Sequence, residues 1–130
     1  MQPDKYKIFF QKTGKILFAI AMADRKIAPK EYKALQDIIE EELKLSYLEE
    51  CELKHITQMK NVFDWMIKNP RPTDEILDEF KQFKNENYTL FTPEIKDFIY
   101  KTANRIAGSY ANKNKSELII LAKIHFILKD

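Results

Sequence analysis

The sequence predicts an all-α fold, a compact bundle of about six to seven helices that forms a single domain over residues 1–130. Three observations predict it. Only two of the 130 residues are glycine, whereas strand-rich folds use many glycines in their turns. Apolar residues make up 45% of the chain and recur at helical spacing. Each expected helix also begins at a proline or at a side chain that can cap its first turn.

The first two helices are expected to begin at prolines. Pro3 opens the first helix, whose apolar positions broadly keep a helical spacing as far as Ala21. Pro29 suits the first position of the second helix, because its missing N–H has no partner to lose there. Apolar residues at helical spacing, from Tyr32 to Leu43, then form one stripe. This stripe predicts a second helix with one buried face.

A capping box predicts the third helix. Ser46 is followed three residues later by Glu49. The side chain of Ser46 can accept a hydrogen bond from the backbone N–H of Glu49, and the side chain of Glu49 can accept one from the backbone N–H of Ser46. The helix is expected to reach Lys68, with a kink or an interruption on the way, and the sequence Asn-Pro-Arg-Pro at 69–72 ends it. Trp65 is expected in the core.

Three further helices complete the bundle. Thr73 is expected to cap the fourth helix, and Thr92 with Pro93 opens the fifth. Asn114 and Glu117 are expected to cap the last.

Apolar residues cover nearly all faces of this last segment, residues 118–128. It is therefore either the central helix of the bundle or a helix that also carries an interface. The second interpretation predicts that the following residues bind a partner or a second copy of the chain: Ile119, Ile120, Phe126 and Ile127.

The first and last helical hairpins match each other in sequence. Without a gap, residues 20–21 align with residues 106–107, both Ile-Ala, and Glu31 aligns with Glu117, an offset of 86 positions. Each unit consists of a helix, a polar corner and a second helix with a glutamate in its first turn. The alignment predicts two pseudo-repeated helix-corner-helix hairpins.

The first corner, residues 21–31, has the sequence Ala-Met-Ala-Asp-Arg-Lys-Ile-Ala-Pro-Lys-Glu. It resembles the tellurite-resistance TerB-like family, which also occurs as the N-terminal region of some membrane-anchored J-domain proteins. The signature of that family is A-x-A-D-G-x-I followed by a glutamate that opens the next helix, and Arg25 replaces its glycine here. A second, degenerate copy is typical of the family, and residues 106–117 lie where it is expected. The resemblance covers most of the chain and implies an all-helical, stress-associated domain.

The same resemblance implies a metal site formed by acidic residues at the two corners. The carboxylates that match are Asp24, Glu31 and Glu117, and Asn112 offers an amide oxygen, while Tyr110 replaces the second aspartate. A hard cation such as Ca²⁺ takes about six to eight oxygen ligands, so water would complete the set. The expectation is either no cofactor or a weakly bound divalent cation.

A structural interpretation of the same residues competes with metal binding. Glu31 and Glu117 each stand at the third position of an expected helix, where glutamate caps backbone N–H groups. Asp24 precedes the positive end of the next helix dipole, and Arg25 beside it competes with a cation for its carboxylate. Both interpretations stay open at this point.

Composition narrows the function classes further. The net charge is +2, which does not indicate nucleic-acid binding, and no uninterrupted apolar run reaches the roughly 18 residues of a membrane span. No glycine-rich phosphate loop, nucleophile motif or pair of groups poised for proton transfer is found. A single cysteine and the lack of a signal-peptide pattern favour the cytoplasm. The sequence therefore predicts a cytoplasmic, non-enzymatic protein that binds a protein partner or itself.

Charge is distributed unevenly along the chain. Residues 36–56 are predominantly acidic, and residues 96–129 are predominantly basic. Such an arrangement is typical of a solvated bipolar surface, and the alternative is a surface on which a partner docks.

Overall fold

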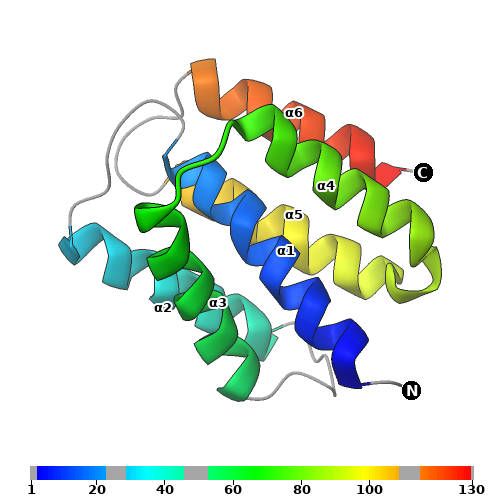
Figure 1. Ribbon diagram of the computed structural model, residues 1–130, viewed down its shortest axis with the longest axis horizontal. Helices are drawn as coiled ribbons and strands as arrows, with labels where there is room; N and C mark the ends of the chain where they lie inside the picture. Colours follow the sequence, from blue (N-terminus) through cyan, green and yellow to red (C-terminus); the bar gives the residue numbers. More distant parts are fainter. Residues whose placement is uncertain (1–2, 23–28, 46–52, 109–114, 130) are drawn as a thin grey trace.

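The computed structural model describes residues 3–22, 29–45, 53–108 and 115–129. They form six α-helices and one short 3₁₀-helix, with no strand in these ranges, so the all-α prediction is confirmed (Figure 1). None of these helices is long and apolar enough to cross a bilayer. The elements are α1 (Pro3–Ala21), α2 (Pro29–Leu45), α3 (Leu53–Lys68), α4 (Thr73–Glu86), η1 (Tyr88–Leu90), α5 (Pro93–Ala107) and α6 (Lys115–Lys129).

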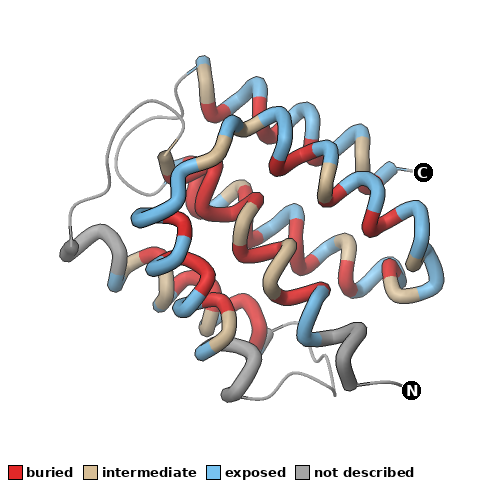
Figure 2. Tube along the Cα trace, in the orientation of Figure 1, coloured by how far each residue is buried: buried red, intermediate tan, exposed pale blue. Residues whose placement is uncertain are grey.

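Helix α1 is the central helix of the bundle. It packs against α3, α4, α5 and α6, and α2 lies on the far side against α5 and α3 (Figure 1). All six residues from 16 to 21 are buried, so this C-terminal part of α1 is covered on every side. Buried positions on the other helices turn toward it (Figure 2). Of the two interpretations of the last helix, the central position is therefore wrong, because α6 lies at the edge.

The caps predicted for two helix starts have different outcomes: the cap of α5 is confirmed and the cap of α4 is wrong. The Oγ1 atom of Thr92 accepts a hydrogen bond from the backbone N–H of Ile95 at 3.3 Å, which confirms the predicted cap of α5. The predicted cap at Thr73 is wrong, because Thr73 is already the first helical residue. Pro72 occupies the capping position, and its carbonyl accepts from Glu75 N–H. The expected capping box at 46–49 lies outside the described residues.

A short 3₁₀-helix, absent from the sequence prediction, connects α4 to α5. Its turn returns Phe91 to the core, where only 5% of the residue is exposed. The Phe91 ring meets the rings of Phe9, Phe80 and Phe83 edge to face, with centroids 5.6, 5.8 and 6.1 Å away. Such pairs contribute about 0.5–1.5 kcal/mol each beyond the apolar area they bury. The connection is thereby held against both α1 and α4.

One carboxylate joins α1, α4 and the linker between α3 and α4. Glu79 Oε1 accepts hydrogen bonds from Lys12 Nζ at 2.7 Å and Lys15 Nζ at 3.2 Å, and Oε2 accepts from Arg71 at 2.6 Å. Burial by itself would raise the pKa of Glu79. The hydrogen bonds from Lys12, Arg71 and Lys15 outweigh it and lower that pKa to about 2. Glu79 is therefore ionised at neutral pH.

The acidic and basic segments of the sequence meet where α2 packs on α5. Arg105 of α5 donates to Glu41 and to Glu42, both at 2.9 Å, and these hydrogen bonds raise the pKa of Arg105. Lys123 of α6 similarly binds Asp74 of α4 at 3.0 Å. Part of the charge asymmetry is thus neutralised within one molecule.

The predicted repeat has matching helix bounds. Helices α1 and α5 end at Ala21 and Ala107, and α2 and α6 begin at Pro29 and Lys115, in both cases 86 positions apart. Packing differs between the hairpins. Helix α6 packs on its neighbour α5, whereas α2 packs mainly on α5 and α3. The duplication itself stays a prediction.

The Glu79 cluster makes stability depend on pH. The folded-state pKa of about 2 lies below the ordinary 4.5, so the stabilisation is present above pH 4.5 and is lost as pH falls toward 2. We expect Glu79→Gln to lower the free energy of unfolding by roughly 1–3 kcal/mol at pH 7, and by less near pH 3, which lies between the unfolded and folded pKa values. Urea denaturation at both pH values measures this. Asp78→Asn, an exposed neighbour on α4, is the control. An equal loss at both pH values would contradict the ionic origin.

Helix α1 approaches α3 closely at Gly14. A Cβ atom added there would lie 3.6 Å from Cα of Met59 and from Cγ1 of Val62, an ordinary van der Waals distance. Because glycine is a poor helix former, we expect Gly14→Ala to stabilise the protein by up to about 1 kcal/mol. Gly14→Leu would instead push the helices apart and destabilise it. The urea midpoints of the two variants test this, and a destabilised alanine variant would show that the contact between α1 and α3 has no room for a methyl group.

Candidate functional site

The predicted metal ligands lie mostly outside the described residues. Asp24 and Asn112 belong to residues 23–28 and 109–114, which the structure does not describe. Glu31 is the third residue of α2, but its side chain is also not described. Glu117 is the third residue of α6, as expected, and is buried with 7% exposed. The gathering of these four residues around a cation stays a prediction.

The described part of the chain offers no other metal centre. Within it, no three histidine, cysteine, aspartate or glutamate side chains are grouped closely enough to hold an ion. Glu79, a carboxylate within it, is bound by three cationic side chains instead.

The predicted partner-binding residues divide between two faces of α6. Ile119 and Phe126 are exposed, at 46% and 68%, whereas Ile120 is buried at 6% and Ile127 is partly buried against the core. Leu118, which the prediction did not include, is 50% exposed. Burial of Ile120 follows from the helical period, because its side chain projects toward the same side as Ile124.

The exposed apolar residues of α6 form one stripe. Ile119, Ala122 and Phe126 follow one another by three and four positions, and Leu118 lies four positions before Ala122, so all four share the outward side of the helix. We call these four residues the α6 stripe. A row of rings runs beside it. The ring centroid of Tyr100 of α5 lies 5.4 Å from that of His125, and the ring centroid of His125 lies 6.4 Å from that of Phe126. This side of α6 can accept a single apolar helix along its length.

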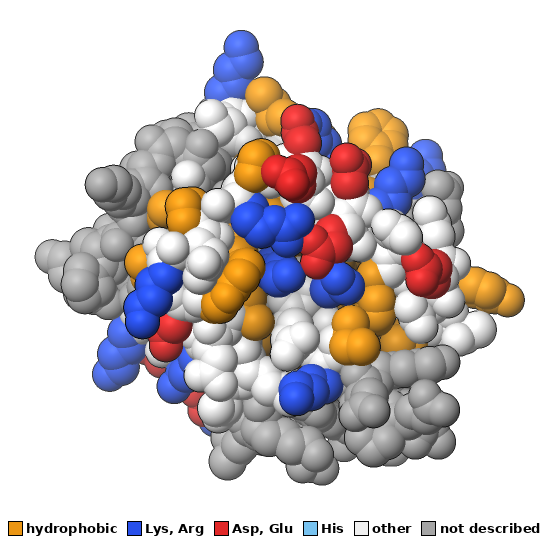
Figure 3. All heavy atoms as spheres, in the orientation of Figure 1, with side chains coloured by type: hydrophobic (Ala, Val, Ile, Leu, Met, Phe, Trp, Pro, Cys, Tyr) orange, Lys and Arg blue, Asp and Glu red, His pale blue; other side chains and the backbone are white. Residues whose placement is uncertain are grey.

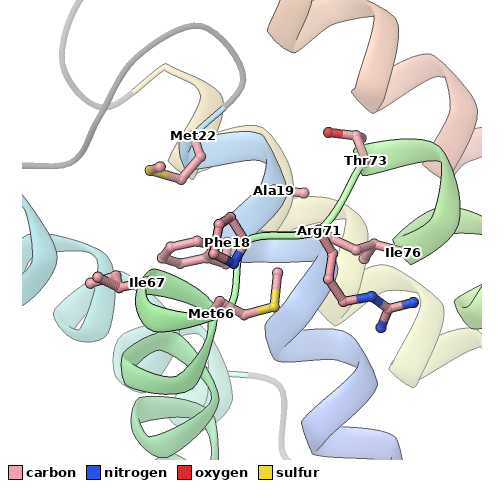
Figure 4. A pocket seen from close by; sticks show the side chains of 9 residues that line it. Phe18, Ala19, Met22, Met66, Ile67, Arg71, Thr73 and Ile76 are labelled. Atoms are coloured by element: carbon pink, nitrogen blue, oxygen red, sulfur yellow. The ribbon is translucent and has the colours of Figure 1, made fainter.

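A pocket opens between α1, the end of α3 and the start of α4. Its volume is about 470 Å³. Its floor consists of the buried residues Phe18, Ala19, Met66 and Ile76. Figure 4 shows side chains from α1, α3 and the α3–α4 linker around this space, with Met22 and Ile67 on the side away from Arg71. Among the lining residues that are described, Arg71 alone carries a charge.

The charges within the Glu79 cluster at the pocket's edge do not cancel. Arg71, Lys12 and Lys15 share the single carboxylate of Glu79, so the four side chains together carry two positive charges. Figure 3 shows several basic side chains gathered on the visible face, with acidic and hydrophobic side chains around them.

Trp65 lies beside this cluster rather than in the core. It is 47% exposed, and Lys15 Nζ lies 5.5 Å from the centroid of its ring. The prediction of a buried Trp65 is wrong, because Phe63 and Met66 take the inward positions of this turn of α3. A cation over an indole ring explains how the side chain is held at the surface.

Sequence reasoning did not identify the pocket or the charge cluster. Lys12 and Glu79 are 67 residues apart, and no local motif links them. The one available signal was Arg71, a lone cation between the two prolines of 69–72.

Comparison with models of known protein families, with curated proteins and with solved structures finds no match for this chain. The resemblance to the TerB-like family stays a prediction that rests on residues 21–31 and 106–117.

The helical position of Glu31 gives a test of capping against metal binding. Because α2 begins at Pro29, Glu31 is its third residue, and we expect Glu31→Ala to cost roughly 0.5–2 kcal/mol through a lost cap. Arg25 beside Asp24 opposes a cation, so added Ca²⁺ or Mg²⁺ should leave the melting temperature unchanged. Thermal denaturation with and without millimolar Ca²⁺ measures this. A rise of several degrees that Asp24→Ala abolishes would establish the metal site instead.

Proposed function

We propose that this chain is a non-catalytic helical interaction module that binds a protein partner through the outward side of α6. The observation that carries the proposal is the α6 stripe, in which Phe126 and Leu118 expose half or more of their surface. Large apolar side chains gathered on one exposed face are typical of protein-binding surfaces. Full burial of a side chain such as Phe126 is worth about 1.5–3 kcal/mol, so a partner that covers the stripe gains stability.

The charges around the stripe favour a partner with acidic flanks. Lys115 and Lys129 lie at its two ends, and both are exposed. Lys123, at its edge, is already paired with Asp74. Glu117, the one acidic residue of α6 as described, is buried. In a pair of α6 helices from two copies, whether parallel or antiparallel, these end lysines would face lysines. Charge complementarity therefore supports an amphipathic helix with acidic flanks over a second copy of the chain.

A binding role also agrees with the chemistry of the described carboxylates and histidine. Glu79 has a pKa of about 2 and three cationic partners, so it cannot donate a proton near neutral pH. His125 is exposed and contacts the rings of Tyr100 and Phe126 at steep angles rather than lying beside a nucleophile. Neither group meets the requirement of general acid–base catalysis.

The cellular role is proposed from the family resemblance. The corner sequence at 21–31 resembles the TerB-like family, which supports a stress-associated role in the cytoplasm. The second proposal from that resemblance, divalent-metal binding at the corners, is tested by the Ca²⁺ measurement above.

Two synthetic peptides test the proposed surface. Both are amphipathic helices with the same leucine face, one flanked by glutamate and the other by lysine. We expect calorimetry to detect the acidic peptide only, and Phe126→Ser to weaken its binding by about tenfold or more, as for an aromatic residue at the centre of an interface. Tyr88→Ser, which removes a 71% exposed ring far from α6 in sequence, should leave binding unchanged.

Sedimentation equilibrium of the protein alone tests whether a second copy of the chain covers the α6 stripe instead. A monomer that binds the acidic peptide supports the proposal. A dimer that Phe126→Ser dissociates would show that the stripe serves self-association instead, and equal binding of both peptides would remove the charge argument.

A further inference from the structure

We infer that the pocket between α1, α3 and α4 binds a small amphipathic carboxylate, with its apolar body against the pocket floor and its carboxylate on Arg71. This site lies on α1, α3 and α4 and is independent of the proposed role of α6. The inference combines the shape and chemistry of the pocket with the unbalanced charge at its edge.

The apolar part of the site is already formed. Phe18, Met66 and Ile76 are each at most 3% exposed and present apolar surface to a space of about 470 Å³. Small-molecule sites in proteins typically have volumes of about 300–1,000 Å³, mostly apolar walls and a few polar groups. Ile67 belongs to the wall but is 51% exposed, so a ligand would cover apolar surface that now faces solvent.

The polar part of the site selects an anion. Arg71 contributes one guanidinium nitrogen to Glu79, and a guanidinium has five N–H donors, so donors remain for a ligand. Lys12 and Lys15 also bind Glu79, and the four groups keep two positive charges. A ligand carboxylate beside Arg71 would reduce this excess and accept charge-assisted hydrogen bonds.

The start of α4 supports the same choice of ligand. Thr73, its first residue, lines the pocket and adds a hydroxyl group. A single carboxylate with an apolar chain satisfies the guanidinium, the hydroxyl and the walls together.

Decanoate is the probe for this site, with decanol and butyrate as controls for the charge and for the chain. Isothermal titration calorimetry of the whole protein measures binding, and fluorescence of Trp65, the sole tryptophan, gives a second readout. We expect saturable decanoate binding at one site and at least about tenfold weaker binding of decanol, as for loss of a hydrogen bond to a charged group. Butyrate should bind more weakly than decanoate, because it covers less of the wall.

Four variants separate the parts of the site. Arg71→Gln should weaken decanoate by at least about tenfold, whereas Lys101→Gln, an exposed cation on α5, should not change binding. Ile67→Asp should abolish binding, whereas Ile8→Asp, at a similarly exposed isoleucine, should not.

Glu79→Gln gives the sharpest result, because it destabilises the fold and yet removes the carboxylate that competes for Arg71. We expect decanoate to bind this variant more tightly than the parent protein. A purely structural role of the cluster would give weaker binding. Equal affinity for decanol and decanoate, equal binding to the Arg71→Gln and Lys101→Gln variants, or no detectable binding would each overturn the inference.

Discussion

The apolar C-terminal part of α1 is the constraint on which the rest of the fold depends. Six consecutive residues, 16–21, are apolar and buried, so no side of this part of the helix can face water. A helix that is apolar all round must be enclosed, and here α3, α4, α5 and α6 enclose it. Each surrounding helix needs only one apolar face to do so. The outward faces of the bundle are thereby free to carry other chemistry.

Local signals in the sequence were sufficient for the helices but not for their arrangement. Prolines 3, 29 and 93 mark helix starts because a missing N–H costs nothing there, and this holds whatever the tertiary fold. Local signals do not determine which helix occupies the centre of the bundle. Lys12 and Lys15 interrupt the apolar pattern of α1, whereas apolar residues cover nearly all faces of residues 118–128. The sequence could therefore suggest α6 as the central helix, although α1 takes that place.

The same reasoning explains which site residues the sequence could predict. The exposure of Phe126 and Ile119 follows once α6 lies at the edge, because only one of its apolar faces can then be buried. The contacts of Glu79 join residues 67, 64 and 8 positions away. Their formation depends on the packing of α4 on α1, which no spacing rule encodes. Trp65 was misplaced for the same reason, since its partner Lys15 belongs to another helix.

The Glu79 cluster connects stability with the unbalanced charge. Removing either lysine would reduce the excess positive charge, but it would also remove one of the contacts that hold α4 against α1. The fold therefore retains three cations around one carboxylate, where repulsion between the cations opposes their attraction to Glu79. An anion bound at Arg71 would relieve this repulsion without loss of a contact. By linkage, such a ligand stabilises the folded protein in proportion to RT ln(1 + [L]/Kd). The contacts that position α4 thus create the conditions for anion binding beside it.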